Sequence, residues 1–365
     1  MSGQVKGWCP GAHRPMQAAD GLILRIRPKL GRLTAAQAQG LAALAQAEGQ
    51  SHLALTSRAN LQWRGVKSQR YETIMAGLDA LGLLDADAAQ EQARNMLLTP
   101  FWAEGDGTLE LAEALTAALP NFPALPGKFG FALDTGPAPV LAEISADIRL
   151  ERDAAGGLLV RADGAMRGES VTAQTAIPAI RKLADWFLAQ GGAPGGRGRM
   201  RGLIRTGTLP PGLNAGPAAR AGQTPPLASF AFGELPVESL AALAGLGTEL
   251  RLTPWRALYL PGLTGLPALP GLIGAEDPLQ RTFACTGAPG CAEGFAPTRA
   301  LATALAAHLP PGKTLHVSGC GKLCAHPGRC DVTLIAAPDG FHLNDGPGLD
   351  PAALLSHPRR VFGRP

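Results

Sequence analysis

The feature that most restricts the fold of this chain is an internal repeat, in which two similar segments lie about 200 residues apart. Residues 21–66 have the pattern of a strand, a Gly-x-Leu turn, an Ala- and Leu-rich helix and two short strands, and residues 225–263 show the same order. The repeat predicts two β-α-β-β half-units that pair about a pseudo-twofold axis to complete one sheet domain. The alternative is that Leu-rich strands and Ala-rich helices align here by chance, although the shared order of motifs weighs against it.

A longer segment follows each half-unit. After the first, we expect a helix over 69–84, strands that turn at Gly156 and Gly157, and a helix that ends at Gly191. After the second, Pro297 can begin a helix, residues 313–317 favour a strand and residues 331–343 favour a hairpin. The stretch GGAPGGRGRMRG (191–202) is interpreted as a flexible basic loop, since it lacks the spacing of a dinucleotide-binding motif.

Charge and hydropathy exclude several classes of protein. The net charge is only +4 and no block of Lys and Arg with interleaved aromatic residues occurs, which argues against a nucleic-acid-binding protein. The N-terminus lacks the apolar core of a signal peptide, and later apolar runs are shorter than the ~18 residues of a membrane span. We therefore expect a cytoplasmic protein without a membrane segment, whose cysteines remain reduced.

Four of the six cysteines form two close pairs, Cys285 with Cys291 and Cys320 with Cys324. The wide first pair does not suit a zinc ribbon, whose cysteine pairs are separated by two to four residues. Glycines and prolines around both pairs would let the backbone approach a four-iron cluster and donate N–H groups to its sulfur atoms. Free thiols, a disulfide and structural zinc are the alternatives. Cys9 and Cys330 do not fit the tetrad.

A row of polar donors lies in the first half-unit. Alternating residues of an extended strand point to one face, which predicts a shared face for Arg58, Asn60, Gln62 and Arg64. Such a row suits a ligand with several carboxylates, because guanidinium groups bind carboxylates in pairs of hydrogen bonds. The alternative is a solvated strand face with scattered arginines.

The cysteine spacing, placed behind a repeated half-unit, resembles the nitrite and sulfite reductase superfamily along most of the chain. The resemblance implies an α+β fold, with two ferredoxin-like half-domains forming a pseudo-twofold unit and two α/β lobes around it. It places the half-domains at 12–67 and 222–266, the first lobe at 70–205 and an iron–sulfur lobe at 275–365. It also implies that Cys285, Cys291, Cys320 and Cys324 bind a 4Fe-4S cluster, which in sirohaem enzymes is bridged to the sirohaem by the last cysteine.

The same resemblance assigns residues to the substrate. Arg25, Arg58, Gln62 and Arg64 match positions that bind the macrocycle, and Arg94 and Lys128 match positions that hold a small anion above it. Two departures stand out. The reductases have a second lysine where this chain has Gly130, and their Cys-Pro-Asn-x-Cys pattern is here Cys320-Gly-Lys-Leu-Cys324 followed by Ala-His-Pro.

These departures, with the motifs CPGAHRPMQAADGLILRIRP, LTSRANLQWRGV and RNMLLTPFW, resemble the precorrin-3B synthase branch of the superfamily. That resemblance implies a monooxygenase of aerobic cobalamin biosynthesis that hydroxylates precorrin-3A at C20 and closes a γ-lactone. Its electrons would come from NADH through a separate reductase. The competing interpretations are a sirohaem-dependent sulfite or nitrite reductase and a cluster-bearing electron carrier or scaffold without a substrate.

The resemblance further implies a mononuclear non-haem iron, whose ligands the sequence does not identify. A facial triad needs two histidines and a carboxylate. His13, His316 and His326 are the histidines nearest to the motifs, and His326 could equally donate a hydrogen bond near Cys324.

Overall fold

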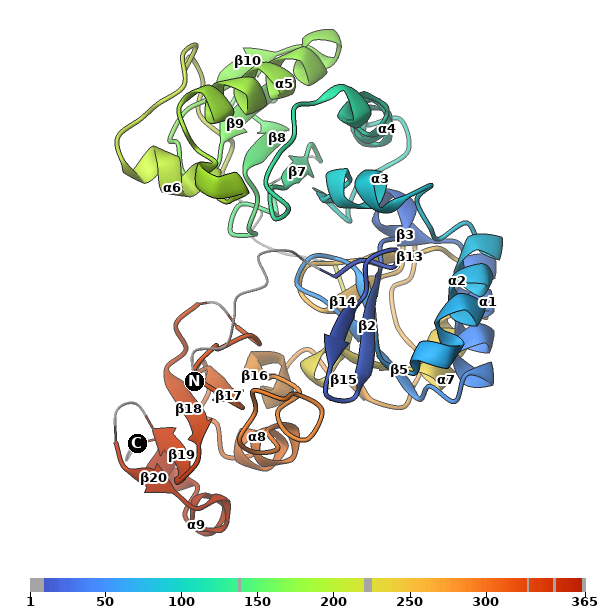
Figure 1. Ribbon diagram of the computed structural model, residues 1–365, viewed down its shortest axis with the longest axis vertical. Coiled ribbons are helices and arrows are strands. Elements are labelled where there is room, and N and C mark those ends of the chain that lie inside the picture. The colour runs from blue at the N-terminus through green and yellow to red at the C-terminus, as the bar shows by residue number, and fades with distance from the viewer. Residues whose placement is uncertain (1–9, 137–138, 220–224, 327, 344–345, 363–365) are drawn as a thin grey trace.

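The structure is a computed structural model that describes residues 10–136, 139–219, 225–326, 328–343 and 346–362. Its strands and helices form a central unit flanked by two lobes (Figure 1). None of the helices in these ranges has the length and apolar character needed to cross a membrane.

The central unit contains two five-stranded sheets, and each half-unit contributes a strand to the other's sheet. The first sheet has the order β1 (Met16–Ala18), β2 (Gly21–Ile26), β5 (Leu61–Val66), β4 (His52–Leu55) and β12 (Glu234–Pro236). The second has the order β15 (Leu272–Ile273), β11 (Ala228–Phe230), β14 (Ala257–Tyr259), β13 (Leu250–Leu252) and β3 (Arg32–Leu33). Strand β12 from the second half therefore completes the first sheet, and β3 from the first half completes the second.

Matched backbone geometry confirms the pseudo-twofold relation. Before each Gly-x-Leu motif a bulky residue takes a positive φ, 55° at Leu30 and 58° at Phe232. The turns before the last strands of the two halves also match, with φ of 50° at Ala59 and 57° at Arg256. Helix α1 (Ala35–Ala47) packs against its counterpart α7 (Val237–Ala244), and both contribute to one core shared by the two sheets.

The two lobes share one topology, a similarity that the sequence did not reveal. Each has a five-stranded sheet in sequential order, in which the first three strands are parallel and the last two antiparallel. In the first lobe these strands are β6 (Met96–Leu98), β7 (Phe131–Asp134), β8 (Ile148–Arg152), β9 (Leu158–Ala162) and β10 (Glu169–Val171). In the second they are β16 (Thr282–Ala284), β17 (Leu315–Ser318), β18 (Val332–Ala337), β19 (Gly340–Leu343) and β20 (Gly348–Leu349).

Equivalent connections join the strands of the two lobes. Helix α4 (Thr108–Ala118) links the first two strands of one lobe, and α8 (Arg299–Ala306) does so in the other. A long loop then links the second strand to the third, over 135–147 in the first lobe and 319–331 in the second. The first of these loops inserts Leu141 into the central core. The second carries Cys320 and Cys324.

The remaining helices cover the lobes and the edge of the central unit (Figure 1). They are α2 (Tyr71–Ala80), α3 (Ala88–Ala93), α5 (Ala173–Ala189), α6 (Met200–Arg205), α9 (Pro351–Ser356) and α10 (Arg359–Phe362). The predicted domain boundaries remain predictions.

The interpretation of 191–202 as a loop holds for 191–199, apart from one 3-10 turn at Pro194–Gly196, but not for the last three residues. Its C-terminal part begins helix α6, and two of its arginines pair with buried carboxylates of the first lobe. The Nε atom of Arg199 lies 2.9 Å from Asp147, and that of Arg201 lies 2.8 Å from Asp163. These ion pairs hold the stretch in place, and a single sequence does not reveal such distant partners.

Candidate functional site

The four paired cysteines lie at one edge of the second lobe's sheet. Cys285 directly follows β16 and Cys320 lies two residues after β17, and these two strands are parallel neighbours. Because the carboxyl ends of parallel strands meet at the same edge of a sheet, the two loops are brought together there. The Gly319 amide donates a hydrogen bond to Cys285 Sγ at 3.1 Å, which joins them directly.

The close packing of the two loops explains why residue 319 is a glycine. A Cβ atom added to Gly319 would lie 2.9 Å from Gly287 Cα and 3.5 Å from Cys285 Sγ. Any side chain at this position would therefore push the loops apart. The hydroxyl of Thr298 also donates to the Cys285 carbonyl at 2.5 Å, which anchors the first loop to the start of α8.

The other three thiols affect the ionisation of Cys324. Burial of the sulfur raises the pKa of Cys324, and the charges of Cys320, Cys285 and Cys291 raise it further. A thiolate at Cys324 is therefore unfavourable unless a cation compensates its charge. Cys330 lies at the opposite end of β17, beside Thr314, and Cys9 is outside the described residues.

The spacing of thiolates differs between a single zinc ion and a four-iron cluster. Across the described ranges, no three His, Cys, Asp or Glu side chains form a group that could hold one metal ion. Thiolates around one tetrahedral zinc ion are about 4 Å apart, because each sulfur lies about 2.3 Å from the metal. A four-iron cluster holds its thiolates farther apart and accepts backbone N–H donors such as Gly319.

The three histidines nearest to the motifs do not assemble into a facial triad. His13 Nε2 lies 2.8 Å from the Asp85 carbonyl, in a different part of the molecule from the other two. The rings of His316 and His326 are 6.4 Å apart, and that of His326 stacks on Phe283 at 4.1 Å. The donors in the described residues therefore do not fit a mononuclear iron held by two histidines and a carboxylate.

His316 is nevertheless unusual, since its side chain is buried and its Nε2 atom has no hydrogen-bond partner among the described residues. Burial lowers its pKa to about 4, with smaller contributions from the charges of His326 and Arg256. The ring is therefore neutral at physiological pH.

The predicted donor row is only partly a strand face. Strand β5 begins at Leu61, so Gln62 and Arg64 lie on it, whereas Arg58 and Asn60 lie in the preceding turn. The prediction that all four alternate along one strand was wrong because Ala59 takes a left-handed conformation, with φ of 50°. Arg25 on β2 is directly opposite Gln62 and adds a guanidinium to the same face.

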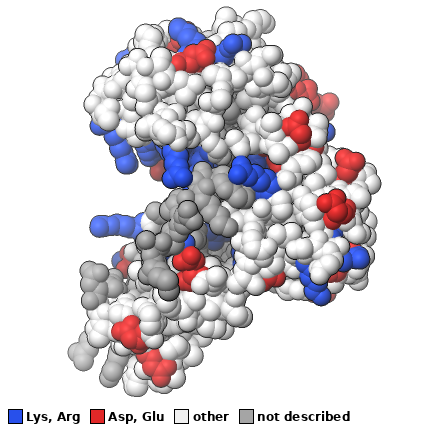
Figure 2. Space-filling view, viewed as in Figure 1, with Lys and Arg blue, Asp and Glu red and all other residues white. Residues whose placement is uncertain are grey.

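Within this face, Arg25 carries a buried Nε atom that has no hydrogen-bond partner in the described part of the chain. Burying a polar donor without a partner is unfavourable, so this atom is suited to an acceptor on a ligand. Lys and Arg side chains also gather along the walls of a hollow between the two lobes (Figure 2).

Asn95, which the sequence analysis did not single out, connects two of the predicted substrate residues. Its Oδ1 accepts a hydrogen bond from Arg58 at 3.2 Å, and its Nδ2 donates to the carbonyls of Lys128 and Phe129 at 3.5 and 2.7 Å. It also explains Gly130, because a Cβ atom there would lie 2.8 Å from Asn95 Nδ2. The second lysine of the reductases thus has no room here unless Asn95 moves.

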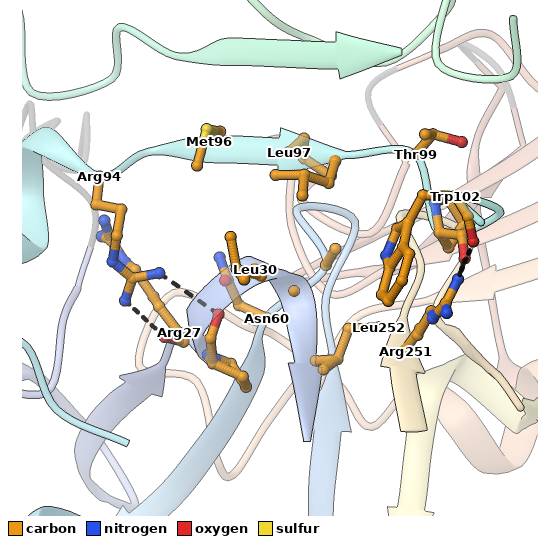
Figure 3. Close-up of a pocket in the computed structure, with 15 residues that line it drawn as sticks. Arg27, Leu30, Asn60, Arg94, Met96, Leu97, Thr99, Trp102, Arg251 and Leu252 are labelled. Atoms are coloured by element: carbon orange, nitrogen blue, oxygen red, sulfur yellow. Dashed lines mark hydrogen bonds between the residues drawn. The ribbon is translucent and has the colours of Figure 1, made fainter. Parts of the chain in front are cut away.

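Arg94 makes many contacts within the protein. Its guanidinium forms two hydrogen bonds to Asp85, both 2.8 Å long, and donates to the Arg27 carbonyl at 2.7 Å. It lies at one end of a pocket between β6 and the central unit, and Arg251 stacks on Trp102 at the other end (Figure 3). This geometry ties the first lobe to the central unit.

Arg94 also lines a cavity of about 850 Å³ on the other side of α3. The wall of that cavity carries the carboxylates Asp85, Asp87 and Glu91. The same wall also carries Arg14, Arg27 and Arg94, and Arg94 pairs with Asp85, so the cavity carries charges of both signs. It is separate from the donor face, because its lining does not include Arg25, Arg58, Gln62 or Arg64.

Comparison with known proteins agrees with this architecture. Residues 14–81 match the family model described as the nitrite/sulfite reductase ferredoxin-like half domain. The structure of the NirA protein of Mycobacterium tuberculosis superposes with a TM-score of 0.65 and 19% identity, over 93% of this chain and 80% of that one. The chain has the fold of the nitrite and sulfite reductases.

A curated relative points to one branch. A precorrin-3B synthase of a Sinorhizobium species is 28% identical, over 93% of this chain and 82% of its own length. The resemblance to precorrin-3B synthase and to the wider superfamily is thus confirmed, and these relatives indicate an enzyme.

Proposed function

We propose that this protein is a precorrin-3B synthase, a monooxygenase that hydroxylates precorrin-3A at C20 and closes a γ-lactone. The observation that carries the proposal is the similarity to a curated protein of that name over 93% of this chain. In this reaction one oxygen atom of dioxygen enters the product and the other is reduced to water, which requires two electrons and two protons. We propose that NADH supplies the electrons through a separate reductase.

In this proposal the substrate lies on the donor face of the first half-domain. Arg25, Arg58 and Gln62 would bind its acetate and propionate groups, whereas Arg64, also predicted for this role, pairs with Asp20. The lack of a protein acceptor for the Arg25 Nε atom among the described residues supports this role, because no ion pair in that part of the chain holds the guanidinium. Lys128 is exposed and linked to Arg58 through Asn95, so it can reach an adjacent carboxylate. Arg94 would contribute by holding the first lobe against the central unit.

Cys285, Cys291, Cys320 and Cys324 would hold a 4Fe-4S cluster. When bound, such a cluster accepts and passes single electrons. The protein's own contribution is to orient the macrocycle and to keep its carboxylates ionised, since a neighbouring guanidinium favours the charged form. We assign no residues to a mononuclear iron.

The proposal is tested with purified protein that has been reconstituted with iron and sulfide without oxygen. Incubation with precorrin-3A, a reductant and isotopically heavy dioxygen should give a product that carries one heavy oxygen atom, measured by mass spectrometry. If the product carries no heavy oxygen, the monooxygenase proposal is wrong.

Absorbance spectra separate the alternatives. A sirohaem enzyme shows sharp Soret and red bands, whereas a cluster alone gives a broad brown shoulder. Copurification of one sirohaem per chain would favour the sulfite or nitrite reductase. Cys320→Ala and Cys324→Ala should each abolish the brown colour, and full iron and sulfide content in either variant would contradict the ligand assignment.

A further inference from the structure

An arginine of the first half-domain holds the first cysteine loop. Arg64 on β5 donates two hydrogen bonds to Asp20, at 3.0 and 3.1 Å, and a third to the Gly290 carbonyl at 2.7 Å. Gly290 immediately precedes Cys291. Since Asp20 neutralises Arg64, this contact fixes the loop by geometry and adds little net charge.

An arginine of the second half-domain holds the second cysteine loop. Arg256 occupies the turn position that matches Ala59, and its guanidinium donates to the carbonyl of Ala325, directly after Cys324. Each loop of the tetrad is therefore bound to a different half-domain, by an arginine side chain that donates a hydrogen bond to the backbone next to a cysteine.

Arg256 differs from Arg64 in its charge balance. It is half-buried, and no carboxylate pairs with it among the described residues. Its charged or titratable neighbours are Arg299, which is bound to Glu234 at 2.7 Å, and the rings of His316 and His326. Covering a guanidinium without an anionic partner is unfavourable, which indicates that a negative group belongs beside it.

We propose that Arg64 and Arg256 clamp the two cysteine loops between the half-domains, and that Arg256 is the counter-charge of the anionic iron–sulfur cluster. This inference rests on the proposed function, because it requires the cluster. Four thiolates give a 4Fe-4S cluster a net negative charge that grows by one unit on reduction. A nearby unpaired cation stabilises the reduced form and raises the reduction potential.

The test uses the full chain, reconstituted with iron and sulfide, in three variants. Arg256→Gln removes the charge and the clamp, Arg256→Lys keeps the charge but loses the planar guanidinium, and the double variant Asp20→Asn/Arg64→Gln removes the other clamp without a net charge change. The matched control is Arg70→Gln, whose exposed arginine pairs with Glu48 and whose loss changes the net charge equally.

Two measurements separate charge from geometry. In a spectroelectrochemical titration, Arg256→Gln should lower the equilibrium constant for cluster reduction about tenfold, which lowers the reduction potential by ~59 mV for one electron. Arg256→Lys and the double variant should keep a reduction potential near that of the wild type. All three variants should lose the cluster to a chelator about tenfold faster than the control, because each loses a hydrogen bond from a charged group.

The outcomes are distinct. If the wild type takes up no cluster, the cofactor assignment fails and this inference fails with it. If the wild type loads normally but Arg256→Gln keeps the wild-type potential and the control's rate of cluster loss, only this inference is overturned. Should Arg256→Gln fail to fold by circular dichroism, the cluster-loss rate of Arg256→Lys decides the question, and a wild-type rate would overturn the clamp.

Discussion

The buried carboxyl of Asp134 should make the first lobe less stable as the pH rises, and Asp134→Asn should remove this effect. The side chain is 1% exposed at the end of β7. Its Oδ2 accepts hydrogen bonds from the amides of Val140 and Leu141 at 2.8 and 2.6 Å, whereas its Oδ1 has no partner in the described part of the chain. Burial raises its pKa to about 6, despite the opposing effect of those two amides.

The sign and size of the change in folding free energy follow from this pKa. The unfolded chain ionises near pH 3.8 and the folded protein near pH 6, so the unfolded state gains relative stability between these values. The total loss of folding free energy is about 3 kcal/mol, and roughly 1.4 kcal/mol of it develops between pH 5 and 8. An asparagine keeps an oxygen for the two amides and has no charge, so the Asp134→Asn variant should lack this part of the pH dependence.

The assay is urea unfolding followed by circular dichroism at pH 5 and pH 8, with each variant compared to the wild type. Asp163→Asn is the matched control, because hydrogen bonds and charges from Arg201 and Arg149 outweigh burial there and lower the pKa. Relative to the wild type, Asp134→Asn should gain stability from pH 5 to 8, whereas Asp163→Asn should not. If the unfolding free energies of Asp134→Asn and the wild type differ by the same amount at pH 5 and pH 8, this result refutes the argument.

Two further predictions concern the candidate site. Gly319→Ala should lower the iron and sulfide content of the reconstituted protein, because its Cβ atom would press on Gly287. The control Gly321→Ala should bind iron normally, because a Cβ atom there would meet nothing within 4 Å. Arg58→Gln should weaken binding of precorrin-3A about tenfold in a fluorescence titration, since a charged hydrogen bond to a carboxylate is lost, whereas equal affinity in Arg58→Gln and Arg70→Gln would argue against a role for Arg58.

Much of the architecture could be predicted because it follows local rules. The repeated turns require left-handed residues at fixed places, and Gly31 and Gly233 mark them in the sequence. The second cysteine pair was correctly placed after a strand, since residues 313–317 have an apolar strand pattern. The matching topology of the lobes was missed because their sequences share no comparable markers.

The candidate site was harder to predict because its geometry depends on distant partners. The strand pattern gave no sign that Ala59 would turn the backbone and move Arg58 away from Gln62. Asn95 joins Arg58 to the Lys128 backbone only once the first lobe is folded against the central unit. Alternation along one strand reports which side chains share a face, but it carries no information about contacts between lobes.

The exchange of strands between the half-units has a consequence for protein synthesis. Strand β4 pairs with β12, so the ribosome must add residues 56–236 before the edge of the first sheet is covered. At 5–20 residues per second this takes roughly 10 to 40 s, during which the nascent chain exposes an unsatisfied strand edge. Chaperones that shield emerging polypeptides would therefore be expected to raise the yield of this protein, and its premature release would favour aggregation.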